Sequence, residues 1–244
     1  MGHEQITRIL AIRHGETAWN RDHRIQGFLD IALNDAGLAQ AERMAQALAD
    51  EAIDAVYSSD LQRAHATALP LARSRGLAVQ TDTGLRERCF GTFEGLTFVE
   101  LEALYPEETL RWRRRDPDFG PAGGERLVDF DARCIAAIAR LAERHRGGCI
   151  AVVSHGGVMD CLYRAAARLS LDAPRTWTVA NASINRVLHS PEGFALIGWG
   201  DTRHLDGTEH AALDSLSSRH ALTTDELRAA VLDDDSDGGR TTAA

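Results

Sequence analysis

Two short motifs place histidines and an arginine directly after runs of apolar residues. Arg13-His14-Gly15 follows an apolar run at 9–12, and His155-Gly156-Gly157 follows the run CIAVVS at 149–154. Both runs have the composition of buried strands. Arginine donates paired hydrogen bonds to phosphate oxygens, and neutral histidine is a nucleophile near pH 7. The motifs therefore indicate a site that binds and attacks a phosphoryl group.

A second arginine has a similar position. Arg63 lies in the segment SSDLQRAHAT, just after an expected strand at 55–58. If these strands are parallel neighbours, their carboxyl ends bring two arginines and two histidines to one edge of a sheet. Gly15 and Gly156 would let backbone N–H groups approach the ligand closely, and helix N-termini there would add positive potential. A single histidine at a strand end is usually structural, but the joint pattern favours a phosphate pocket.

Phosphoryl transfer from an ester also needs an acid that protonates the departing oxygen. The glycine-punctuated segment LRERCFGTFEG at 85–95 contains Glu87 and Glu94, and Glu16 lies beside the first motif. Residue types and spacing alone leave the choice among these three carboxyl groups open.

Strand-like and helix-like segments alternate along the chain. Strands are expected at 6–12, 55–58, 78–81, 149–154, 183–189 and 194–200, and helices at 35–51, 61–75, 98–105, 107–114, 127–145 and 157–167. This alternation predicts an α/β fold: a three-layer α/β/α sandwich with a mostly parallel central sheet. In such sheets ligands bind outside the carboxyl ends of the strands.

Composition limits the possible functions. The 244 residues are 44% hydrophobic, with a formal net charge of −9, so one large domain at 1–205 is expected and a nucleic-acid partner is not. A compositionally distinct tail, 206–244, is expected to be partly mobile, with one helix candidate at Thr224–Leu232. Neither a secretory signal nor a membrane span is recognisable. The four cysteines are scattered along the chain, and we expect them to be reduced thiols that form no disulfide bond. We therefore expect a cytoplasmic protein without a membrane partner, and a homodimer is compatible with the sequence.

The sequence resembles the histidine phosphatase superfamily, also called the phosphoglycerate mutase-like family. The motif RHGETAWN at 13–20 carries the resemblance most strongly. Further motifs follow in family order: IQG at 25–27, LNDAGLAQA at 33–41, YSSDLQRAHATA at 57–68, LRERCFGTFEGL at 85–96, VVSHGG at 152–157 and NASI at 181–184. The match covers about residues 6–200 and implies the phosphoglycerate mutase-like sandwich.

The resemblance also implies a role for each matching residue. His14 is the nucleophile that becomes phosphohistidine, and Glu87 is the general acid and then the base that activates water. The phosphoryl oxygens are bound by Arg13, Arg63 and a protonated His155. Residues implied on the substrate side are Asn20, Gln26, Gly27 and Gly156. No cofactor and no metal is implied, and the ten histidines show no metal-ligand spacing.

Three functions fit this pattern. The first is a metal-independent phosphomonoesterase that hydrolyses small phosphorylated metabolites in the manner of the phosphatase branch. The others are a cofactor-dependent phosphoglycerate mutase and a non-catalytic phosphate-binding relative. The mutases that the sequence resembles have a tyrosine and a lysine where this chain has Phe90 and Phe98, and a longer insertion before the second histidine motif. Both differences favour hydrolysis, whereas the run Arg113–Arg115 weakens the argument because mutases have paired arginines nearby.

The sequence leaves the physiological substrate undetermined. Four aromatic residues could form an apolar lid over the phosphate pocket or belong to an ordinary core: Phe90, Phe93, Phe98 and Trp112. Likewise, the run Arg113–Arg115 could contact a second anionic group of the substrate or form a solvated helix end.

Overall fold

A six-stranded sheet forms the centre of the protein. The computed structural model describes residues 5–206. Its strands are β1 (Thr7–Arg13), β2 (Ala55–Ser58), β3 (Val79–Thr81), β4 (Cys149–Ser154), β5 (Ile184–Ser190) and β6 (Gly193–Asp201), in the spatial order β3-β2-β4-β1-β5-β6. β1 to β4 are mutually parallel, β5 pairs antiparallel with β1, and β6 pairs antiparallel with β5. The expected mostly parallel sheet is confirmed.

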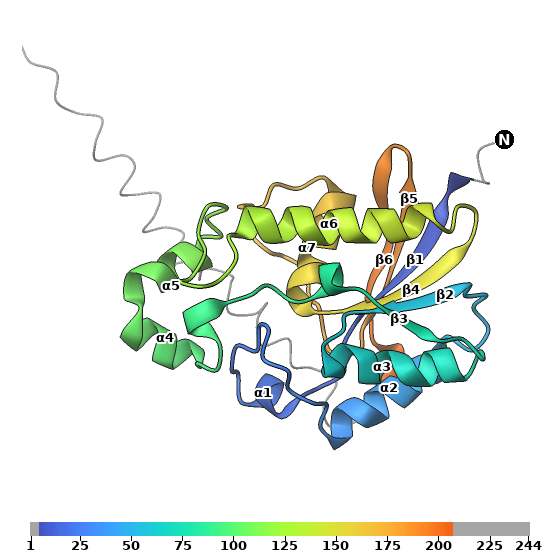
Figure 1. Cartoon of the computed structure of the whole chain (residues 1–244), viewed down its shortest axis with the longest axis horizontal. Helices are drawn as coiled ribbons and strands as arrows, with labels where there is room; N and C mark the ends of the chain where they lie inside the picture. Colours follow the sequence, from blue (N-terminus) through green and yellow to red (C-terminus); the bar gives the residue numbers. More distant parts are fainter. Residues whose placement is uncertain (1–4, 207–244) are drawn as a thin grey trace, which may run out of the picture.

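Two layers of helices cover the sheet (Figure 1). α2 (Asp35–Ala47) and α3 (Gln62–Arg73) pack on one face, and α6 (Leu127–Glu143) and α7 (Gly156–Ala167) on the other. Every residue of β4 is buried because its side chains alternate between the two faces. Ile150 and Val152 belong to the core under α6 and α7, whereas Ala151 and Val153 belong to the core under α2 and α3. This explains the continuous apolar run CIAVVS and confirms the three-layer sandwich.

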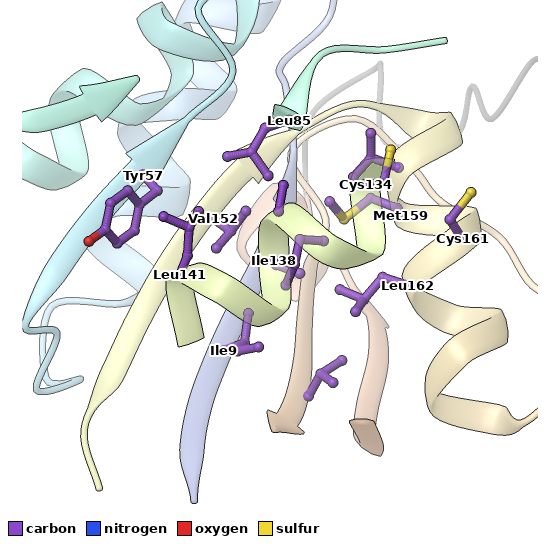
Figure 2. Close-up of a cluster of buried hydrophobic side chains, with 14 of the residues drawn as sticks. Ile9, Tyr57, Leu85, Cys134, Ile138, Leu141, Val152, Met159, Cys161 and Leu162 are labelled. Carbon is purple, nitrogen blue, oxygen red and sulfur yellow. The ribbon is translucent and has the colours of Figure 1, made fainter. Parts of the chain in front are cut away.

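The apolar face of α6 closes the larger of the two cores (Figure 2). Cys134, Ile138 and Leu141 recur at helical spacing along α6 and are buried against sheet residues such as Ile9 and Val152. α6 is therefore fixed rigidly over the sheet.

A third, mostly aromatic cluster lies outside the sandwich, under α4 (Phe98–Leu104) and α5 (Pro106–Arg113). The rings of Phe98 and Trp112 stack with centroids 5.3 Å apart, and Phe93 contacts Trp112 edge to face. Aromatic contacts of this kind add to the stabilisation from buried area. Thr97 caps α4 and exchanges hydrogen bonds with Glu100 in a capping box.

The structure differs from the sequence-based expectations mainly at helix ends. The helix expected at 35–51 ends at Ala47, because Leu48 already forms its C-cap and turn hydrogen bonds follow from Ala49 to Glu51. A short helix that was not expected, α1 (Ala18–Arg21), follows the first motif and is capped by Thr17. The tail beyond Asp206, including Thr224–Leu232, lies outside the described residues. Within residues 5–206, no helix is long and apolar enough to cross a membrane.

Candidate active site

The carboxyl ends of β1 and β4 bring the two histidine motifs together. The backbone N–H of His14 donates to the carbonyl oxygen of Ser154, the last residue of β4, at 2.8 Å. The ring centroids of His14 and His155 lie 5.2 Å apart. His14 lines a cavity of about 440 Å³ that is open to solvent, together with Arg13 and Arg63, whereas His155 is not part of its lining. The expected convergence of these side chains is confirmed for His14, Arg13 and Arg63.

The environment of His14 favours its neutral, nucleophilic form. Its Nδ1 lies 2.7 Å from the carbonyl oxygen of Gly15, which can only accept a hydrogen bond, so we assign the ring proton to Nδ1. Nε2 is then unprotonated. Burial, followed by the positive charges of Arg63 and Arg13, holds the pKa of His14 well below its ordinary value of 6.5. His14 is therefore neutral at physiological pH.

Both arginines are buried and held through carbonyl oxygens. Arg63, in the first turn of α3, donates to the carbonyl oxygens of Leu29 and Gly27 at 2.8 Å each. Arg13, at the end of β1, donates to the carbonyl oxygen of Val179. Burial lowers the pKa of Arg63 to about 10, which leaves it charged at neutral pH. The site thus keeps two fixed positive charges.

His155 immediately precedes α7 and is fully buried. Neither ring nitrogen has a hydrogen-bond partner among the described residues. Burial, followed by the charges of Arg63 and His14, holds the pKa of His155 well below its ordinary value. The protein by itself therefore favours neutral His155, and not the protonated form that the resemblance implies. A dianionic group placed between the two rings would raise the pKa of His155 and favour the donor form.

Of the three candidate carboxylates, Glu87 lines the cavity. Its Oε1 accepts from the N–H of Arg88 at 2.9 Å and its Oε2 from the N–H of Gly157 at 3.1 Å. Glu94 instead accepts from the backbone N–H groups of Phe28 and Phe90, both at 2.9 Å, and so ties two loops together. Glu16 is buried and accepts from the Asn34 side chain at 2.7 Å. Glu87 is thus the one of the three carboxyl groups that lines the cavity, whereas Glu94 and Glu16 hold the backbone and a neighbouring side chain in place.

The residues expected on the substrate side all line the same cavity: Asn20, Gln26, Gly27 and Gly156. Gly27 has a φ of 50°, and a Cβ there would lie 2.1 Å from Oε1 of Glu94, so this position requires glycine. One residue that holds the site was not singled out from the sequence. Asn181 donates to the carbonyl oxygens of His14 and Gly15 at 2.9 and 3.2 Å, and its only signal was its place in the NASI motif.

The aromatic residues serve both purposes that the sequence left open. Phe90 and Phe98 line the cavity and also belong to the aromatic cluster, in which Phe93 and Trp112 are buried as well. The arginine run also divides. Arg113 pairs with Glu102 and Arg114 is exposed, while Arg115 turns toward a second cavity next to the first.

Within residues 5–206, no group of three or more histidine, cysteine, aspartate or glutamate side chains could hold a metal ion. The arrangement is instead a cationic pocket with a neutral imidazole and one carboxyl group at its wall. Such a pocket can bind a phosphoryl dianion, attack its phosphorus atom and exchange a proton with the oxygen on the far side.

Comparisons with known proteins agree with this geometry. A sequence model of the histidine phosphatase superfamily (branch 1) matches residues 9–202. The chain is 42% identical to phosphoglycerate mutase-like protein 4 of Arabidopsis thaliana, over 82% of this chain and 87% of that protein. It is 35% identical to the metal-independent phosphoserine phosphatase of the same plant, over 82% of this chain and 84% of that protein. A mycobacterial glucosyl-3-phosphoglycerate phosphatase superposes with a TM-score of 0.73 at 33% identity, covering 80% of this chain and 99% of that one.

Proposed function

Because the chain belongs to the histidine phosphatase superfamily, branch 1, we propose that it is a metal-independent phosphomonoesterase acting on small phosphorylated metabolites through a phosphohistidine intermediate. The observation that carries this proposal is the state of His14. Its Nδ1 is tied to the Gly15 carbonyl oxygen, which leaves Nε2 as the nucleophilic atom in a pocket with two buried arginines.

Binding comes from charge that is already in position. Arg13 and Arg63 donate to the oxygens of the phosphoryl dianion, and His155 donates once the dianion has raised its pKa. Because the carbonyl oxygens of Gly27 and Leu29 already fix the Arg63 guanidinium, little reorganisation is needed when the ligand binds. The same charges stabilise the transferring phosphoryl group in the transition state, which is the main task in phosphoryl transfer.

The first chemical step forms a bond from Nε2 of His14 to phosphorus and breaks the bond from phosphorus to the ester oxygen. Glu87, in its protonated form, gives a proton to the departing oxygen, so the alcohol leaves uncharged. The N–H groups of Arg88 and Gly157 hold the Glu87 carboxyl group in a single orientation for this transfer. A positioned acid of this kind contributes about 10²- to 10⁴-fold in rate.

The second step returns the enzyme to its starting state. Glu87, now a carboxylate, takes a proton from a water molecule, and the water oxygen bonds to the phosphorus atom of phospho-His14. The bond from phosphorus to Nε2 breaks, and inorganic phosphate and neutral His14 result. Glu87 ends protonated, ready for the next cycle. Two displacements through one covalent intermediate replace a single difficult one.

A phosphoglycerate mutase is the second candidate, and the name of the Arabidopsis mutase-like relative keeps it open. Hydrolysis is favoured because Phe90 and Phe98 line the pocket, and neither ring can bind an anion. The chain contains no lysine at all, so no other lysine can replace the one expected in a mutase. Between the segment that carries Glu87 and α6, the chain forms only a 3₁₀ turn, α4, α5 and the loop at 114–126, so no long lid insertion is present to keep water from phospho-His14.

A non-catalytic phosphate-binding role is less well supported, because the residues proposed for catalysis are all present around one pocket.

We also propose a cytoplasmic location. The four cysteines are free, as is usual in a reducing compartment.

The test is to trap the intermediate. The enzyme, treated with EDTA, is mixed with ³²P-labelled phosphoserine or nitrophenyl phosphate and quenched within milliseconds, and the labelled peptide is mapped. We expect an acid-labile phosphoryl group on His14 and none on the His14→Ala variant. A His14→Ala variant with wild-type turnover, or activity that EDTA abolishes and Mg²⁺ or Zn²⁺ restores, would contradict the proposal.

A further inference from the structure

A second cavity adjoins the phosphate pocket. It has a volume of about 500 Å³, is open to solvent, and shares Glu87, Phe90 and Gly156 with the first. Glu87 is therefore at the junction of two spaces. Since the proposed acid must lie beside the oxygen that leaves, the space on its other side is suited to receive the remainder of the leaving group.

Arg88 gives this second cavity a buried positive charge. Its guanidinium donates to the carbonyl oxygens of Glu125 and Phe119 at 3.0 and 2.5 Å and lies over the ring of Phe90. Within the described part of the chain, Arg88 forms no ion pair with a carboxylate. Burial lowers its pKa to about 10, so it remains charged at neutral pH.

Further positive charge gathers around one carboxylate. Asp160 of α7 is approached by the guanidinium nitrogens of Arg115, Arg164 and Arg175, at 2.5, 3.0 and 3.5 Å. Arg115 and Arg175 line the cavity together with Asp160. Asp131 also interacts electrostatically with Arg115 and Arg164. The residues that line the cavity include three arginines (Arg88, Arg115 and Arg175) and two carboxyl groups (Glu87 and Asp160), so arginines outnumber carboxyl groups in the lining.

The backbone of Arg115 turns the chain at the end of α5, directly after the C-cap Arg114. Its φ of 56° lies in the left-handed region, which is costly for a residue other than glycine. The side chain is held there by donation to the carbonyl oxygen of Leu171 at 2.7 Å and by the pair with Asp160. The remaining walls include Phe90, Trp112 and Phe130, which place apolar surface beside the charged groups. A built cationic pocket with apolar sides is typical of a site for an anionic ligand group.

We propose that this second cavity binds an additional anionic group of the substrate, so that the enzyme selects phosphate monoesters whose alcohol part carries a carboxylate or a second phosphate. The inference rests on the proposed phosphatase function and adds to it the chemistry of the leaving group. Arg88 and Arg115 act as specificity residues, and the arginines at 113 and 114 do not take part.

The experiment compares substrates that differ only in the second charge. O-phosphoserine is paired with O-phosphoethanolamine to test a carboxylate, and fructose 1,6-bisphosphate with fructose 6-phosphate to test a phosphate. We expect kcat/KM for the wild-type enzyme to be about tenfold or more higher for the doubly anionic member of at least one pair, since charge-assisted hydrogen bonds give discrimination of this order. Which pair responds identifies the anionic group.

The variants test where this preference arises. Arg115→Gln should lower kcat/KM for the preferred substrate about tenfold while changing its partner substrate less than about twofold. Arg88→Gln should also lower the ratio of the two kcat/KM values about tenfold, and only this ratio is used for it because the backbone N–H of Arg88 holds the proposed acid. Arg114→Gln, at an exposed neighbouring position, is the matched control and should keep the preference. Using the ratio within a pair removes any general loss of active protein.

Three results would overturn the inference. The wild-type enzyme could hydrolyse nitrophenyl phosphate yet treat both members of each pair alike, which would leave the phosphatase function intact. Both arginine variants could lower the two members of a pair equally, or Arg114→Gln could abolish the preference. By contrast, a wild-type enzyme with no activity on any phosphate monoester would count against the proposed function itself.

Discussion

Arg133 of α6 donates a hydrogen bond of 3.1 Å to the backbone carbonyl oxygen of Glu87. The same guanidinium donates to the carbonyl oxygens of Gly84 and Arg86 and forms paired hydrogen bonds with the carboxylate of Glu125. One side chain of α6 therefore binds three backbone carbonyl oxygens in the segment that ends with the proposed acid. The carboxylate of Glu125 also accepts a hydrogen bond of 2.8 Å from the backbone N–H of Cys89, which holds the same segment from its other end.

Replacing Arg133 should consequently impair the acid more than the nucleophile. Arg133→Gln should slow the hydrolysis of alkyl phosphates about 10- to 100-fold, because a catalytic group displaced by about 1 Å loses much of its effect. Nitrophenyl phosphate, whose phenolate leaves with little proton assistance, should be affected less. Arg140→Gln, on the same helix with an exposed pair to Asp82, is the control and should change neither rate. Equal losses for both substrates would assign Arg133 a purely structural role.

Glu87→Gln should show the same substrate dependence in stronger form. The amide keeps the shape of the side chain but cannot transfer a proton, so turnover of alkyl phosphates should fall about 10²- to 10⁴-fold, and that of nitrophenyl phosphate much less. Glu94→Gln keeps an acceptor for the N–H groups of Phe28 and Phe90 but removes its charge, so it should weaken these hydrogen bonds and reduce stability while keeping the ratio of the two substrates. A larger change of that ratio in Glu94→Gln would identify Glu94 as the acid.

The two buried histidines should make the protein less stable in acid. Their pKa values are lower in the folded protein than the ordinary value of 6.5. Between the folded value and about 6.5, the unfolded chain therefore binds protons that the native protein does not. The stabilisation is fully present above about pH 6.5 and is lost as the pH falls through the folded pKa values. Urea unfolding from pH 8 to pH 5 should show this fall, and His155→Asn should flatten it. A wild-type profile that is flat over this range would refute the expected linkage.

Hydrolysis should exceed phosphoglycerate mutase activity. The enzyme is mixed with 3-phosphoglycerate and 2,3-bisphosphoglycerate, and 2-phosphoglycerate and inorganic phosphate are followed together. We expect inorganic phosphate as the main product, because the pocket presents Phe90 and Phe98 where a mutase would need anion-binding groups. Rapid formation of 2-phosphoglycerate with negligible release of phosphate would assign the enzyme to the mutases.

The sequence predicted the strands well where burial alone determines them. The runs at 55–58 and 149–154 match β2 and β4 residue for residue, because a strand buried on both faces is nearly continuously apolar, here up to its terminal serine. Helix ends were less predictable, since α2 stops four residues before the expected Glu51 through a local C-cap that has no sequence signal such as glycine. The phosphate pocket was predictable because three short motifs, around Arg13-His14, Arg63 and Glu87, contain the residues that line it.

The second cavity could not be predicted in this way. Its lining contains five charged residues. Glu87 and Arg88 are neighbours in the chain, whereas Arg115, Asp160 and Arg175 come from three other segments, and no single motif contains them all. The run Arg113–Arg115 suggested anion binding, but helix geometry sends its members in different directions, and only the left-handed backbone of Arg115 brings that one residue to the cavity. The spacing of residues along the chain does not reveal which side chain of such a run points into a cavity of the folded protein.

The central position of β1 has a consequence for how the protein forms. Its partners β4 and β5 come from the far end of the described chain, and Asn181 contacts the backbone of His14 across 167 residues of sequence. Contacts this distant in sequence form late and slow the folding of a chain. During synthesis, His14 therefore leaves the ribosome long before the residues that bury and orient it, and its surroundings are complete only after Asn181 and β5 have been made.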